Sequence, residues 1–248
     1  MKYLLKLSYL GTDFSGFQVQ SGSDAVTVQG ELCRAARELF CTECAVSGCS
    51  RTDAGVHAIE YFATLEHHSG TSIPPERLPR AMGAFLPRTI AISEATPVPD
   101  DYSVRAHVCE KEYMYVILNT RVPSPFSVGR AWHVPQTLDD KKMNEAAAHF
   151  VGRRDFRAFM ASGSDVIDTT RSVSVCRVEK DGENIKIYIK ADGFLYNMVR
   201  IIAGTLVDVG RGATDVSEIP GIISSLDRSR AGRTAPPDGL YLRRVILK

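Results

Sequence analysis

The sequence has no long apolar run. No stretch of it reaches the roughly 18–20 apolar residues that a membrane-spanning helix needs, so we expect no membrane partner. The first ten residues, MKYLLKLSYL, alternate too regularly and are too short to form a secretory signal peptide. Together these two absences predict a cytoplasmic protein.

Cysteine is also sparse, with six in 248 residues. Cys41, Cys44 and Cys49 lie close together, but no second CxxC pair and no HxxxH pair accompanies them. Structural zinc sites usually combine two such pairs, so free thiols in a reducing compartment are the better interpretation. The sequence contains no glycine-rich phosphate loop and no DxDx hydrolase signature either. We therefore expect no metal site.

The charge balance gives only a weak indication of a nucleic-acid partner. The formal net charge is +1, with −3 in residues 1–100 and +4 in residues 101–248. Of the 30 basic residues, 21 are arginine. Because a guanidinium group binds phosphate through two parallel hydrogen bonds, this composition permits an RNA-binding groove without requiring one.

The hydrophobic pattern divides the chain into two halves, 1–100 and 101–248, at the turn-rich stretch PVPDDYS. The expected strands are 2–10, 44–49, 59–65, 90–98, 110–118, 172–180, 184–192 and 240–247, and the expected helices are 26–40, 75–86, 137–152 and 197–210. Thr27 and Thr137 are typical N-cap residues for two of these helices. Since neighbouring hairpin-like strands interrupt the alternation of strands and helices, the sequence predicts an α+β fold with antiparallel sheets.

The segment GCSRTDAGVHA at 48–58 places an arginine, an aspartate and a glycine between two strand-like runs. An Arg–Asp pair two residues apart is usually a surface ion pair of little energetic value. A loop held between two strands is nevertheless a common place for chemistry. Thr52 can bond the turn backbone, and Gly55 permits a positive φ. An ionised Asp53 aimed by Arg51 could then serve as a nucleophile.

Composition and spacing alone leave two other functions open. A non-catalytic RNA-binding module would need the basic half but not a carboxylate facing phosphates. A hydrolase of small substrates with a carboxylate nucleophile would need a second acid or base to activate water, and the sequence shows none near Asp53. A lone carboxylate thus favours covalent attack or base chemistry that requires no metal.

GCSRTDAGVHA resembles the G-R-T-D-A-G-V-H segment of the TruA-type tRNA pseudouridine synthases. Further motifs of that family follow in the same order: YLGTDFSGFQVQ, DDYSVRAHVCEKEYMYVI, HFVGRRDFRAF, DGFLYNMVRIIAGTLVDVG and AGRTAPPDGLYL. The resemblance therefore runs essentially from end to end. Phe17 stands where the family has Trp, and Arg154 stands where it usually has His.

This resemblance implies two ferredoxin-like halves whose sheets join into one central sheet flanked by helices, with an active-site cleft between the halves. It also implies isomerisation of uridine to pseudouridine in the anticodon stem-loop of tRNA, at position 38, 39 or 40, without a cofactor. Asp53 is then the catalytic nucleophile, and Arg51 and Arg200 are its catalytic partners.

The same resemblance implies the substrate contacts. Tyr113 is the aromatic platform of the base pocket, and Leu240 is a wall of that pocket. Phosphate contacts are expected from the basic loops, at Arg153, Arg154, Arg157, Arg228, Arg230 and Arg233. Because the family binds RNA across two subunits, we expect a homodimer with tRNA as its partner. His57 is expected to be structural and not catalytic.

Overall fold

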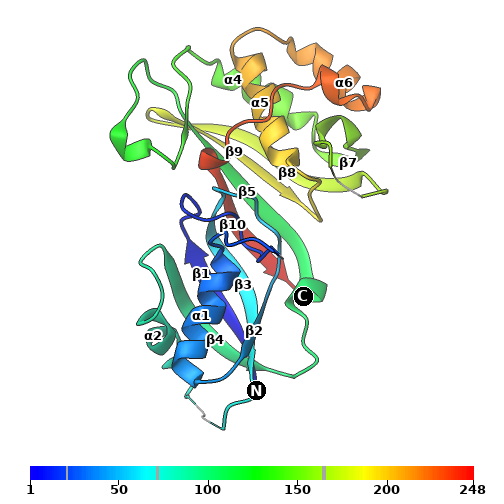
Figure 1. Ribbon diagram of the computed structural model, residues 1–248. Helices are drawn as coiled ribbons and strands as arrows, with labels where there is room; N and C mark the ends of the chain where they lie inside the picture. The colour runs from blue at the N-terminus through cyan, green and yellow to red at the C-terminus, as the bar shows by residue number, and fades with distance from the viewer. Residues whose placement is uncertain (21, 71–72, 164–165) are drawn as a thin grey trace. The chain divides into compact units, whose positions relative to one another are not determined.

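The computed structural model describes residues 1–20, 22–70, 73–163 and 166–248 (Figure 1). It consists of two compact units, Met1–Cys109 with Leu242–Lys248, and Glu110–Tyr241. Each unit combines a sheet with helices, so the expected α+β class is confirmed. The division into domains 1–100 and 101–248 stays a prediction.

The first unit is built on a sheet in the order β4–β1–β3–β10, with β2 paired to β3. These strands are β1 (Lys2–Tyr9), β2 (Cys44–Gly48), β3 (His57–His67), β4 (Ile90–Val98) and β10 (Leu240–Leu247). β1 pairs antiparallel with both β3 and β4. Every second side chain of β1, from Tyr3 to Tyr9, is buried, as the two-residue period of a strand requires.

Helices α1 (Val28–Phe40) and α2 (Leu78–Gly83) pack against this sheet, and α3 (Val104–His107) follows β4 in the chain (Figure 1). Thr27 caps α1 as expected, because its hydroxyl accepts a hydrogen bond from Gly30 N at 3.1 Å. Helix α2 is shorter than the expected range 75–86. A proline occupies one of its first two positions. Proline favours the start of a helix, where the backbone N–H has no acceptor within the helix, so α2 begins next to this proline and not at residue 75.

The second unit contains a sheet in the order β5–β9–β8–β7, and β6 pairs in parallel with the end of β5. The strands are β5 (Val108–Leu118), β6 (Trp132–His133), β7 (Gly152–Asp155), β8 (Thr170–Asp181) and β9 (Asn184–Ala191). The expected hairpin is confirmed, since β8 and β9 are antiparallel and meet at Asp181 and Asn184. Gly182 takes a φ of 60° at its turn.

Helices α4 (Asp140–Ala148), α5 (Met198–Gly210) and α6 (Ile219–Ser225) complete this unit. The predicted cap Thr137 is wrong: α4 begins later, and its cap is Asp139, whose carboxylate accepts from Lys142 N at 3.0 Å. Short 3₁₀ turns occur at Pro125–Ser127, Arg157–Phe159, Val216–Glu218, Arg228–Arg230 and Pro237–Gly239. Across the described ranges, no helix has both the length and the apolar character that a membrane crossing demands.

The loop that follows β1 packs directly against the loop between β2 and β3. Phe17 N donates to Thr52 O at 3.2 Å, and Gly55 N donates to Phe14 O at 3.1 Å. Gly16 has a φ of 93°, and a Cβ at this position would lie 2.5 Å from Thr52 O. Only a residue without a side chain permits this approach. Main-chain contacts from the 11–17 segment therefore fix the loop that contains Asp53.

We predict that Gly16→Ala lowers the free energy of unfolding by about 2–4 kcal/mol, because the new Cβ would overlap Thr52 O in a left-handed backbone conformation. Urea denaturation followed by circular dichroism measures this loss. Gly22→Ala is the matched control: Gly22 has a φ of 76° but open space around it, so this variant should lose only about 1 kcal/mol. Equal losses in the two variants would contradict the packing of the two segments.

Candidate active site

Asp53 opens a tight turn between β2 and β3. Its backbone oxygen accepts a hydrogen bond from Val56 N at 3.2 Å, and Gly55, the third residue of the turn, has a φ of 79°. A positive φ at this position is typical of a type II turn and explains the glycine. The structure thus confirms the positive φ expected at Gly55. Asp53 is half-buried, whereas Ala54 beside it is exposed.

Two buried hydrogen bonds hold the ends of this turn. The hydroxyl groups of Tyr9 and Thr52 lie 2.8 Å apart, and Gly11 N donates to Nδ1 of His57 at 2.9 Å. The expected bond from the Thr52 side chain to the turn backbone is wrong, because the hydroxyl pairs with Tyr9 of β1 instead. His57 is completely buried and accepts a backbone hydrogen bond, so it supports the turn.

Aromatic side chains support the beginning of the same loop. The Tyr61 hydroxyl donates to Ser50 O, and the Tyr61 ring stacks on Phe17 with ring centroids 4.4 Å apart. Cys49 N donates to Phe62 O at 2.9 Å, which continues the pairing with β3 past the end of β2. The loop therefore leaves the sheet from a rigid, buried base.

Arg51 lies in the same loop, but its side chain is exposed. None of the ion pairs found among the described residues includes Arg51. The structure therefore places Arg51 two residues from Asp53 in the chain, and its pairing with that carboxylate stays a prediction.

Arg200 belongs to the second unit and sits in the first turn of α5. Its Nε donates to Ala235 O at 2.7 Å, and its Nη1 donates to Asn197 Oδ1 at 2.8 Å. Asn197 itself has a left-handed backbone, with a φ of 60°. Asparagine adopts that conformation more readily than most residues. These two hydrogen bonds fix the plane of the guanidinium group.

Tyr113 lies on β5 opposite Ile189 of β9, and only 7% of it is exposed. Its ring meets Phe194 edge to face, with centroids 5.0 Å apart and planes at 87°. Such packing fixes the orientation of the ring. Leu240 is buried at the beginning of β10, as a pocket wall or a core residue would be.

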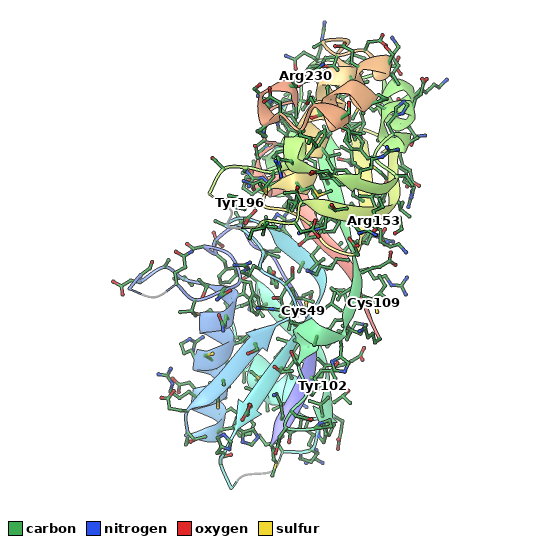
Figure 2. All side chains as sticks on the ribbon, turned by 90° about the vertical axis from the view of Figure 1, so that its right-hand side faces the viewer. Cys49, Tyr102, Cys109, Arg153, Tyr196 and Arg230 are labelled. Atoms are coloured by element: carbon green, nitrogen blue, oxygen red, sulfur yellow. The ribbon has the colours of Figure 1, made fainter. Side chains whose placement is uncertain are left out.

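Two of the six arginines expected to bind phosphate, Arg153 and Arg154, are exposed on β7. Figure 2 labels Arg153 on this part of the second unit. Arg154 lies directly opposite Arg171 of β8. Arg171 donates to the backbone oxygens of Asp168 and Thr170, and the Asp168 carboxylate interacts electrostatically with Arg171 and Arg153.

Sequence reasoning missed several residues that hold these groups. Asn197 and the Ala235 carbonyl orient Arg200, and Tyr115 supports the next carbonyl, since its hydroxyl donates to Pro236 O at 2.7 Å. Burial raises the pKa of Tyr115, which keeps its hydroxyl protonated as a donor. An asparagine three residues before an arginine at a helix start was a usable signal. The carbonyl partners leave no trace in a sequence.

The cysteines do not form a metal centre in the part of the chain that the structure covers. No group of three or more His, Cys, Asp or Glu side chains with the arrangement of a metal site occurs among the described residues. Cys41 is exposed, Cys44 is half-buried and Cys49 is buried, and none of these three forms a disulfide. The interpretation of the cysteines as thiols that bind no metal stays a prediction.

Comparisons with known proteins identify the family. The family model described as tRNA pseudouridine synthase matches residues 7–105 and 146–246. The tRNA pseudouridine synthase A of Thermoanaerobacter sp. (strain X514) is 42% identical over 243 residues, 98% of each chain. That of Acetivibrio thermocellus is 42% identical over 241 residues, 97% of each chain.

Among solved structures, a crystal structure of a Cbf5–Nop10–Gar1 complex aligns with 98% of this chain at a TM-score of 0.42 and 14% identity. The chain spans about half the length of that protein, 48%, and a score this low supports no argument. The family model and the full-length relatives suffice, and they confirm the resemblance found in the motifs: the chain belongs to the tRNA pseudouridine synthase family.

Proposed function

We propose that this chain isomerises uridine to pseudouridine in the anticodon stem-loop of tRNA, at position 38, 39 or 40, with Asp53 as the nucleophile. One observation supports this function best. In a member of this family, the half-buried Asp53 carboxylate sits on a turn that buried hydrogen bonds and main-chain contacts hold rigid. A nucleophile positioned in advance loses little entropy when the substrate binds.

The reaction breaks the N1–C1′ bond of the target uridine and forms a C5–C1′ bond. The proton on C5 leaves and N1 takes up a proton, so the product is an isomer and needs neither an oxidant nor a group donor. Asp53 attacks either the uracil ring or the ribose C1′. Both routes require an ionised carboxylate beside a nucleotide that has left its stack, at a cost of a few kcal/mol.

The remaining proposed contacts offset that cost or stabilise charge. Stacking of the base on Tyr113 would return roughly 1–3 kcal/mol, and Leu240 would close the pocket. Arg51 and Arg200 are the proposed catalytic partners of Asp53, and their guanidinium groups would stabilise negative charge that develops during the reaction. Arg153 and Arg154 would bind phosphates. Contacts of this kind recognise the shape of the RNA backbone and not the base sequence.

We further propose that the protein acts in the cytoplasm as a homodimer, without a cofactor. A net charge of +1 gives a single chain little long-range attraction for RNA. Two copies would present twice the number of exposed arginines to one tRNA, which strengthens binding through the phosphates.

Asp53→Asn should abolish pseudouridine formation, with a rate loss of at least about 10³-fold, because the amide keeps the shape but is not a nucleophile. Mapping of pseudouridines in tRNA incubated with the wild type and the variant measures this loss and also tests positions 38–40. Binding of tRNA, followed by filter retention, should persist in the variant.

Asp101→Asn is the matched control for this experiment. Asp101 is an exposed acid in the turn after β4 of the same unit, and its variant should keep full activity. Turnover by Asp53→Asn within tenfold of the wild type would reject Asp53 as the nucleophile. A wild type that converts no uridine but binds tRNA would favour the non-catalytic binding module.

Arg200→Lys should lower kcat by about 10²-fold, because a single ammonium group cannot reproduce the two oriented hydrogen bonds of the guanidinium fork. Single-turnover kinetics at saturating enzyme isolates this step from product release. Arg177→Lys, on strand β8 of the same unit, should leave kcat unchanged. Full activity of the Arg200 variant would remove this residue from the mechanism.

A further inference from the structure

The chain between Gly232 and Pro236, called here the 232–236 segment, has no regular secondary structure, yet it orients Arg200. Ala235 O accepts from Arg200 Nε at 2.7 Å, and Ala235 N donates to Arg200 O at 3.1 Å. The next residue, Pro236, accepts from the Tyr115 hydroxyl. Any shift of this segment would move the acceptor that fixes the guanidinium plane.

The first residues of the segment are in contact with α5. Gly232 N donates to the Thr205 hydroxyl at 2.9 Å. A Cβ at Gly204 would lie 1.8 Å from Arg233 O, so the two backbones touch at this point. Residues four apart lie on one face of a helix, and Gly204 follows Arg200 by four. The segment therefore runs along the same face of α5 that presents Arg200.

The Arg233 side chain connects this segment to the sheet. Its guanidinium lies over the ring of Trp132, 4.5 Å from the ring centroid. Trp132 is 7% exposed and belongs to β6, where it pairs with Ile117 of β5. Arg233 as a whole is exposed, so stacking, and not burial, holds its side chain. The Asp208 carboxylate of α5 also interacts electrostatically with Arg233.

We infer that Arg233 is a positioning residue, whose stacking on Trp132 holds the 232–236 segment so that Ala235 O orients Arg200. This inference rests on the catalytic role proposed for Arg200. It differs from the phosphate contact that the sequence suggested for Arg233. A positioning residue acts on the chemical step, whereas a phosphate contact acts on tRNA affinity, so kinetics separates the two roles.

The test measures kcat and KM for tRNA, and the dependence of KM on salt, in Arg233→Ala and Trp132→Leu. Both variants should lower kcat about 5- to 20-fold with KM within twofold of the wild type. Trp132 also meets the Tyr115 ring edge to face, so Trp132→Leu removes that contact as well. The double variant should lose no more than Trp132→Leu alone, because the contact with Arg233 is already absent in that variant. Arg233→Lys keeps a cation over the ring and should recover most of the lost kcat.

A matched control shows whether the loss of kcat is specific to Arg233 or follows the loss of any contact between an arginine and an aromatic ring. Arg177 lies 4.2 Å from the centroid of the Tyr188 ring in the same unit, so Arg177→Ala removes an equivalent contact and should leave kcat unchanged. An equal kcat loss in Arg177→Ala would overturn the inference. A raised KM with an unchanged kcat, and a salt slope smaller by about one, would overturn it in favour of a phosphate contact.

The same assays distinguish failure of this inference from failure of the proposed function. If Asp53→Asn is inactive and Arg233→Ala keeps the full kcat, only the positioning role is wrong. If the wild type forms no pseudouridine, the proposed function itself is wrong. Thermal unfolding of each variant shows whether it is folded at the assay temperature. If Arg233→Ala is not folded, the kcat of Arg233→Lys is compared with that of the wild type instead.

Discussion

The direct contact between two backbone segments at Gly16 and Thr52 is the constraint on which the candidate site depends. Asp53 has no regular secondary structure of its own, so its carboxylate can be aimed only if another segment holds the turn. The 11–17 segment does this with main-chain hydrogen bonds and a glycine too close to Thr52 to accept a side chain. Backbone contacts position a turn more precisely than contacts through long side chains do, because fewer rotatable bonds must be fixed.

The two units hold their charged groups by the same physical means. In the first, a type II turn and buried hydroxyl and imidazole groups fix Asp53. In the second, a backbone carbonyl and the side chain of Asn197 fix Arg200. In both, a residue with a positive φ stands within three positions of the charged group, where the chain turns sharply. Such positions are rare in regular structure, and they often mark functional sites.

Much of the fold could be predicted from the sequence, because long periodic segments such as 2–10, 184–192 and 197–210 carry a strong pattern. Short elements such as β6 could not, since two residues have no period. Within the candidate site, Asp53 was evident as a candidate from its motif, although its role stays a prediction, and the positive φ of Gly55 was evident from the turn. The partners of Arg200 were not, because a carbonyl from residue 235 has no sequence signature and is brought there by tertiary packing.

Strand β5 sets a fixed spacing between two tyrosine side chains of the second unit. Tyr113 and Tyr115 are two residues apart on this strand, so their side chains stand on one face at a spacing of about 6.6 Å. The first is the proposed platform for the base, and the second supports the segment that orients Arg200. Any shift of this strand along its axis would move both rings together, so the spacing between the proposed base platform and the hydroxyl that supports the 232–236 segment would not change.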